Sequence, residues 1–273
     1  MTSRTPVRVV SLVSPLGGTG RTTLTAHLAS FLTSLGHTCL AIDLCPQNTL
    51  GKHLGLQEPA EAGWARLASQ RQWWGQAALS NSDGVKLLPF GSASQEALDA
   101  LAQACARNPQ WLRQQLDSLD LPAGSTIFLD TPTWPQPLAR QALATASAVV
   151  TVLEASSRAC QAQAALTQAL AGASPHSRRA IVVNRVDPRR ASHRQALGTL
   201  RTQWGDLLLP YTVHEDENIA QACQKATSVC TWAPYAQSSH DLQGIGRWLV
   251  GPLPSAPPSS AEVEPGALRA QPS

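Results

Sequence analysis

The feature that most constrains this chain is the glycine-rich segment at residues 15–23, which reads Pro-Leu-Gly-Gly-Thr-Gly-Arg-Thr-Thr. An apolar run at residues 7–13 predicts a strand that enters the segment, and residues 22–35 predict a helix that leaves it. Closely spaced glycines let successive backbone N–H groups turn toward an anion, and the helix N-terminus adds its positive end. We therefore interpret the segment as a phosphate-binding loop rather than as an ordinary tight turn.

The residues of this loop that we expect to bind a nucleotide are Gly17, Gly18, Thr19, Gly20, Arg21, Thr22 and Thr23. One position departs from the usual pattern, because the lysine that reaches the β- and γ-phosphates should precede Thr22, where this chain has Arg21. A guanidinium can donate to a phosphate, although its planar fork is bulkier than an ammonium. The chain has only three lysines, Lys52, Lys86 and Lys225, so drift from lysine to arginine is a simple explanation.

Strand-like and helix-like segments alternate along most of the chain. We predict strands at residues 38–43, 85–89, 126–130, 148–153, 180–184 and 207–210, and helices at 63–79, 95–119, 158–170, 191–204 and on through 250. Such alternation predicts an α/β fold with a mostly parallel, doubly wound P-loop sheet and helices on both faces. Ligands of such sheets bind at the carboxyl ends of strands, where we expect Leu16, Asp43, Asp130 and Asn184.

Composition limits the broad class of the protein. At 273 residues, with 43% hydrophobic and 14% charged residues, the chain suits one domain over residues 1–250. Residues 251–273 are rich in proline and serine and are expected to be a disordered tail. A net charge of +3 is too small to imply nucleic acid by itself. The absence of a signal-like or membrane-spanning run and the six scattered cysteines favour a soluble cytoplasmic protein with reduced thiols.

A hydroxyl and two carboxylates form the predicted magnesium site. The Thr22 hydroxyl at the first helical turn would bind Mg²⁺, and Asp43 and Asp130 would stand near it at two strand ends. The alternative interpretation is that Thr22 caps the helix and the acids are strand-end turn residues. The convergence of these positions with the loop favours the metal site.

Four motifs in order resemble the deviant P-loop ATPases of the ParA/MinD class. They are LGGTGRTT, IDLCP, LDTP and VVNR, and the similarity covers about residues 7–250. Within that class, the segments IDLCPQN, GWARL, LLPFG and LLPYTVHEDE resemble the BcsQ (YhjQ) family of bacterial cellulose-biosynthesis proteins. GWARL and LLPFG lie outside the nucleotide motifs, so they give this narrower resemblance its weight.

The resemblance implies ATP and Mg²⁺ as cofactors and a homodimer around the nucleotide. It implies that Asn184 binds the adenine edge and that His214, Glu215 and Asp216 flank the base. The alternative interpretation of Asn184 is a turn-forming residue at the end of a strand. It also implies a regulatory or assembly role in cellulose secretion, with small cytosolic accessory subunits as partners. The inner-membrane synthase would be reached indirectly, and recruitment to the inner face of the membrane or to the cell pole would occur through these partners.

Three departures from the class pattern bear on catalysis. Leu16 replaces the signature lysine that reaches the partner's phosphates, Arg21 replaces the second lysine, and Cys45 replaces the second acid of Asp-x-Asp. Phosphoryl transfer depends on positioning and on neutralising developing charge. We therefore assign no catalytic residue and expect slow or absent ATP hydrolysis.

Two other functions compete with this one. A ParA-like positioning or partition ATPase would act on nonspecific DNA, for which an arginine cluster is the candidate surface, but a solvated or protein-binding face is the favoured interpretation. The cluster comprises Arg178, Arg179, Arg185, Arg189, Arg190, Arg194 and Arg201. A scaffold without nucleotide is disfavoured because the loop glycines remain. The proline-rich end lacks the basic amphipathic helix of a direct membrane anchor.

Three tryptophans lie close together in the sequence outside these motifs. We expect Trp64 in the core, and we expect at least one of the adjacent Trp73 and Trp74 to be exposed, because neighbours on a helix face different ways.

Overall fold

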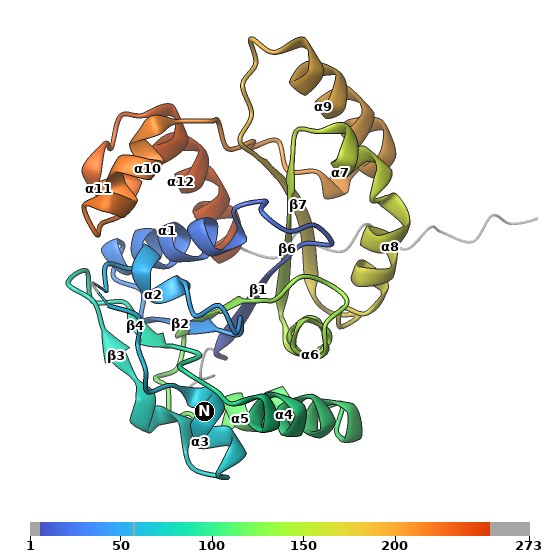
Figure 1. Cartoon of the computed structure of the whole chain (residues 1–273). Coiled ribbons are helices and arrows are strands. Elements are labelled where there is room, and N and C mark those ends of the chain that lie inside the picture. Colours follow the sequence, from blue (N-terminus) through green and yellow to red (C-terminus); the bar gives the residue numbers. More distant parts are fainter. Residues whose placement is uncertain (1–5, 57, 252–273) are drawn as a thin grey trace, which may run out of the picture.

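One seven-stranded sheet runs through the centre of the computed structural model, which describes residues 6–56 and 58–251 (Figure 1). The strands lie in the order β3-β4-β2-β5-β1-β6-β7, and every pairing is parallel except the edge pairing of β3 with β4. Their bounds are β1 (Arg8–Val13), β2 (Cys39–Asp43), β3 (Leu79–Ser80), β4 (Lys86–Leu88), β5 (Thr126–Asp130), β6 (Ala148–Glu154) and β7 (Arg178–Asn184).

Helices cover both faces of the sheet, because successive residues of a strand point to opposite faces and are apolar on both. On β1, for example, Val10 and Leu12 pack against α1 (Arg21–Ser34) and α12 (Gln237–Val250), whereas Val9 joins a cluster on the opposite face. The first face also carries α2 (Leu50–His53), α10 (Glu217–Gln224) and α11 (Val229–Trp232). The second face carries α3 (Trp64–Ser69), α4 (Gln95–Arg107), α5 (Trp111–Asp117), α6 (Pro137–Thr145), α8 (Gln163–Ala171) and α9 (Ala191–Trp204). The predicted fold class is confirmed.

The register of the central strands places the site residues side by side. Asp130, the last residue of β5, pairs with Asp43 on one side and with Leu12 on the other. The glycine-rich loop follows β1 directly, so it lies at the same carboxyl edge of the sheet as both acids.

Residues 207–210 do not form the predicted strand. The chain makes a 3-10 turn at η2 (Gly205–Leu207) and then touches β7 through an isolated bridge between Ile181 and Leu208. Pro210 has no N–H to continue a ladder, and the next backbone bond to β7 comes from Val213 N to Val183 O.

Three predicted helices are interrupted. The helix expected over residues 63–79 ends at Ser69, before Arg71 with φ +55°, and resumes only as the 3-10 turn η1 (Trp74–Ala77). The helix expected over residues 95–119 divides into α4 and α5, because the residue before Pro109 is extended. The third, expected over residues 158–170, divides at Ala162 into α7 (Ser157–Gln161) and α8.

Helices α2 and α6 were not predicted from the sequence, although Pro137 in the first turn of α6 is a recognisable start signal. The predicted tail at residues 251–273 lies outside the described residues except for Gly251. Across the described part of the chain, every helix is too short or too polar to cross a membrane.

Candidate nucleotide site

Three side chains from outside the glycine-rich loop hold three consecutive carbonyl oxygens of that loop. Arg158 and Arg185 donate to the carbonyls of Gly17 and Gly18, at 3.2 and 2.9 Å. Asn184 Nδ2 donates to the carbonyl of residue 19 at 2.8 Å. Because a peptide's C=O and N–H point in opposite directions, these bonds turn the following N–H groups away from the clamping side chains.

The N–H groups of residues 17–20 donate to no acceptor within residues 6–56 and 58–251. Unpaired and consecutive, they have the arrangement that binds an anion, and α1 begins directly after them at Arg21. The loop therefore has the geometry of a phosphate cradle.

Gly20 is the loop position where only glycine fits. Its φ is +89°, and a Cβ atom there would clash with Asn184 Nδ2. Asn184, predicted as an adenine contact, thus touches the loop, and its contact with a base stays a prediction.

Thr22 and Asp130 meet at the start of α1, as the predicted metal site requires. Thr22 Oγ1 donates to Asp130 Oδ2 at 2.7 Å. Asp130 is fully buried, and its other oxygen, Oδ1, accepts no hydrogen bond from any described residue. Burial, and then the neighbouring Asp43, raise the pKa of Asp130 to about 7. A hydroxyl beside an incompletely bonded carboxylate fits Mg²⁺, which prefers oxygen ligands.

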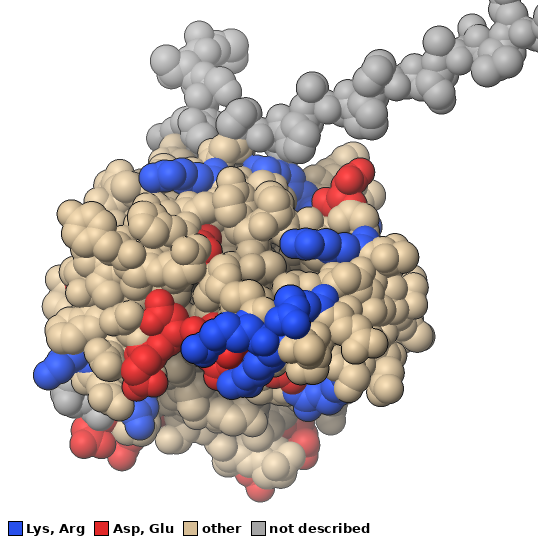
Figure 2. Space-filling view, turned by 90° about the horizontal axis from the view of Figure 1, so that it is seen from above, with Lys and Arg blue, Asp and Glu red and all other residues tan. Residues whose placement is uncertain are grey.

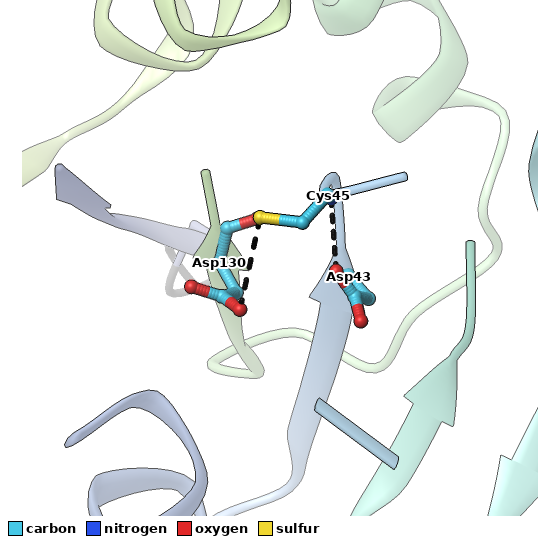
Figure 3. A group of neighbouring side chains, drawn as sticks. All are labelled: Asp43, Cys45 and Asp130. Carbon is cyan, nitrogen blue, oxygen red and sulfur yellow. Dashed lines mark hydrogen bonds between the residues drawn. The ribbon is translucent and has the colours of Figure 1, made fainter. Parts of the chain in front are cut away.

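Asp43, Cys45 and Asp130 form a compact group in which the potential ligand atoms all lie within 4.8 Å of one another (Figure 3). Asp43 binds backbone, since Oδ1 accepts from Cys45 N and Oδ2 from Leu50 N, both at 2.9 Å. Cys45 Sγ points toward Asp130 and lies 3.7 Å from its carbonyl oxygen. Burial raises the pKa of Asp43 to about 6.

The Cys45 side chain is a neutral thiol at this site. Burial, followed by the charges of Asp130 and Asp43, raises its pKa far above the ordinary value. A protonated thiol accepts hydrogen bonds only weakly, so Cys45 does not supply the carboxylate that would orient an attacking water.

The GWARL and LLPFG segments form one structure that supports Asp43. Trp64 N donates to Pro89 O at 3.0 Å, and the Trp64 ring packs edge-on against Phe90 at 5.0 Å between centroids. Trp64 Nε1 donates to the backbone carbonyl of Asp43 at 2.6 Å. Trp64 is fully buried, as predicted, whereas Trp73 is 51% exposed beside the buried Trp74.

Arg21 and Leu16, the other two residues that differ from the class pattern, both contact other parts of the protein. Arg21 donates to the carbonyl of Thr131 at 2.5 Å and to Thr133 Oγ1 at 3.3 Å, in the loop after β5. Leu16 is partly buried against the hydrophobic cluster that contains Val13. The predicted phosphate contact of Arg21 stays a prediction.

A cavity of about 450 Å³ opens beside the loop and is lined by Gly20, Asn184 and the segment that follows Val213. His214 hydrogen-bonds Asp241 Oδ2 through both its backbone N and its Nδ1. Glu215 pairs with Arg190 at 3.2 Å, and Asp216 caps α10. The structure thus brings all three predicted base-flanking residues, His214, Glu215 and Asp216, to the cavity.

Hydrogen bonds also set the charge of Asp216. Burial alone would raise its pKa, but hydrogen bonds from Asn218 and Ser238 hold the pKa below the ordinary value. Asp216 is therefore ionised at neutral pH.

The arginines predicted as one basic cluster are spread over two ends of β7. Arg178 and Arg179 begin the strand, whereas Arg185 follows its last residue. Arg189 and Arg190 both pair with Asp187, and Figure 2 shows basic and acidic side chains side by side on the face seen from above. This pairing reduces the positive potential that nonspecific DNA binding needs.

The hydrogen bonds by which Arg158 and Arg185 hold the loop were not predicted from the sequence. Arg185 entered only in the basic cluster and as the last residue of the VVNR motif, and Arg158 only as a helix start. Each binds a loop carbonyl more than 140 positions away in the chain, so no local pattern signals the contact.

Comparison with known proteins places these features in a family. The chain is 30% identical over 260 residues to the chromosome-partitioning ATPase Soj of Thermus thermophilus, covering 93% of this chain and 99% of the relative. It is 27% identical over 251 residues to the cellulose biosynthesis protein BcsQ of Salmonella typhi, covering 89% and 94%.

Among solved structures, the septum site-determining protein MinD of Pyrococcus horikoshii, complexed with Mg-ADP, has the same fold. The TM-score is 0.70 at 19% identity, with 89% of this chain and 96% of MinD covered. The family model described as cellulose biosynthesis protein BcsQ matches residues 7–250, and the chain, which has the MinD/ParA-like P-loop ATPase fold, therefore belongs to the BcsQ family.

Proposed function

We propose that this chain is an ATP-binding regulatory and assembly subunit of a bacterial cellulose synthesis and secretion system, with weak or absent hydrolysis. The observation that carries the proposal is the clamped loop, in which Arg158, Asn184 and Arg185 leave four consecutive N–H groups free for phosphates. Its cellulose role is supported by the match to the BcsQ family and by the Salmonella relative.

Mg²⁺ would be held by Thr22 Oγ1 and, through bound water, by Asp130, with Asp43 at the edge of the site. When bound, the ion supplies positive charge to the β- and γ-phosphates. Asp130 Oδ1, buried and without a described partner, is the protein atom that gains most from the ion.

Slow hydrolysis follows from the groups that replace the class's charged residues. Leu16 is packed in an apolar cluster and Cys45 is a neutral thiol, so neither can stabilise charge that develops on a transferring phosphoryl group. Binding without turnover suits a protein that uses ATP to hold an assembled state. In this role the chain would form a nucleotide-stabilised homodimer in the cytoplasm. Small accessory subunits would bind the dimer and connect it to the membrane synthase.

Calorimetric titration with ATP, with and without Mg²⁺, tests binding. Thr22→Val removes the hydroxyl and should weaken Mg-dependent binding by about tenfold or more. Thr33→Val is the matched control on the same helix, where the hydroxyl donates to Ala29 O and also hydrogen-bonds Cys39. Equal losses in both variants, or no ATP binding by the wild type, would contradict the proposal.

ATP hydrolysis and the role in cellulose secretion are tested by two further measurements. Phosphate release should be near background in the wild type and should rise when Leu16→Lys, Arg21→Lys and Cys45→Asp are combined. In the source organism, deletion of the gene should reduce secreted cellulose, and the wild type but not Thr22→Val should restore it. Rapid turnover by the wild type would refute weak or absent hydrolysis, and unchanged cellulose after deletion would refute the role in cellulose secretion.

A further inference from the structure

A cysteine and two histidines from three helices meet at the edge of the nucleotide cavity. Cys223 Sγ, on α10, lies 3.6 Å from His27 Nε2 of α1 and 3.5 Å from His53 Nδ1 of α2. Cys223 and His53 both line the cavity, whereas His27 is only 1% exposed behind them. None of these residues belongs to a nucleotide motif of the chain.

The hydrogen bonds assign the protons of this group. Val229 N donates to His27 Nδ1 at 3.2 Å, so Nδ1 is an acceptor and the neutral ring carries its proton on Nε2. His27 Nε2–H therefore donates to Cys223 Sγ. The sulfur is left to donate its own proton to His53 Nδ1, which makes His53 the acceptor in the chain of bonds.

The same assignment disfavours a metal at these residues. A metal on His27 Nε2 would force the ring proton onto Nδ1, where it would face the N–H of Val229. Within the described ranges, the only His, Cys, Asp or Glu group compact enough to hold an ion is Asp43, Cys45 and Asp130. The Cys223 group is thus arranged for thiol chemistry.

We propose that Cys223 is a modification site that forms mixed disulfides with low-molecular-weight disulfides, with His53 as its base. His53 Nδ1 takes the thiol proton as Cys223 Sγ attacks one sulfur of the small disulfide. A sulfur–sulfur bond to Cys223 forms while the original bond breaks, and the departing thiolate takes the proton from His53. Cys223 is oxidised and the departing half is reduced, so the exchange needs no other reactant.

The group rests in a neutral, unreacted state. Burial raises the pKa of Cys223 and lowers the pKa of His53, which keeps the proton on sulfur until an electrophile enters. The hydrogen bond from His27 Nε2–H stabilises the negative charge that then develops on the sulfur.

The modification would regulate nucleotide binding, a consequence that rests on the proposed function. A mixed disulfide on Cys223 would extend into the cavity that also contains Asn184 and His214, where the base of ATP is proposed to lie. Bound ATP and the modification should therefore exclude each other.

Cysteine reactivity in the full chain tests the proposal. The protein is treated with oxidised glutathione, and mass spectrometry follows the mixed disulfide at each cysteine over time. Cys230 is the internal control, because it is also half-buried but its thiol hydrogen-bonds Ser239 O, at 3.9 Å, and Ser228 rather than histidines. We expect Cys223 to react at least about tenfold faster than Cys230.

His53→Asn is the informative variant, because the Asn Oδ1 can replace Nδ1 as an acceptor but cannot take a proton. It should slow Cys223 by about tenfold and leave Cys230 unchanged, with the far-UV circular dichroism and melting temperature of the wild type. Equal rates for the two cysteines, no effect of His53→Asn, or stoichiometric Zn²⁺ binding lost in Cys223→Ser would each overturn the proposal.

ATP with Mg²⁺ separates this proposal from the proposed function. If Cys223 reacts as expected but ATP does not protect it, the thiol site stands and the placement of the base fails. If calorimetry shows ATP binding while Cys223 reacts no faster than Cys230, the thiol proposal fails and ATP binding stands.

Discussion

Acidification should destabilise this fold through His27, whose ring is buried between α1 and α11. Burial, and then the nearby His53, lower the pKa of His27 from 6.5 to about 4. Between these two values the unfolded chain binds a proton at His27 and the folded chain does not. The contribution of His27 to the free energy of unfolding is therefore fully present above pH 6.5 and is lost as the pH falls toward 4.

The size of the effect follows from the two pKa values. At pH 4.5 the loss relative to pH 7.5 is about 2.5 kcal/mol, since one pKa unit corresponds to roughly 1.4 kcal/mol. The side chain is almost completely buried, so solvent screens little of this energy. His53, also lowered by burial, adds in the same direction, whereas Asp43 and Asp130, whose pKa values are raised, act in the opposite one.

A variant isolates His27 from these other groups. His27→Asn keeps an oxygen that can accept from Val229 N but cannot titrate. Urea unfolding of both proteins at pH 7.5 and 4.5 should show that the wild type loses about 2.5 kcal/mol more than the variant, a difference in midpoint of about 1 M. Equal losses in the two proteins would refute the buried, neutral His27.

Three further substitutions, two of them with a control variant, probe the site. Gly20→Ala should reduce the free energy of unfolding by about 2 kcal/mol, because φ is left-handed and the new Cβ would clash with Asn184. Gly17→Ala has open space at its Cβ and should cost less than about 0.5 kcal/mol in the same urea titration. Similar costs for the two variants would contradict this prediction. Trp64→Phe should cost about 1–3 kcal/mol because Asp43 O loses its donor, and calorimetric melting should show a much smaller effect for the exposed Trp73→Phe. Asp130→Asn should abolish the gain in ATP affinity that Mg²⁺ gives in calorimetry, and an unchanged gain would remove Asp130 from the metal site.

The elements with strong local signals were predicted closely from the sequence. The strand expected at residues 126–130 is β5, and the helix expected at 191–204 is α9. Apolar runs of strand length and an uninterrupted helical pattern need no long-range information. Predictions from weaker patterns were wrong in two places. Pro109 divides the helix expected over residues 95–119, and the chain after Gly205 makes only an isolated bridge with β7 instead of the expected strand.

By itself, the sequence determined the order of loop, helix and strand-end acids, because glycine spacing and buried strands are local properties. It also determined where the chain departs from the charged residues of the class, at Leu16, Arg21 and Cys45. Only the tertiary structure decided which side chains hold the loop in place, since Arg158 and Arg185 reach it from the segments that follow the neighbouring strands β6 and β7. It alone decided that Cys223 meets His27, 196 positions away, because such contacts depend on how helices from distant segments pack on one face.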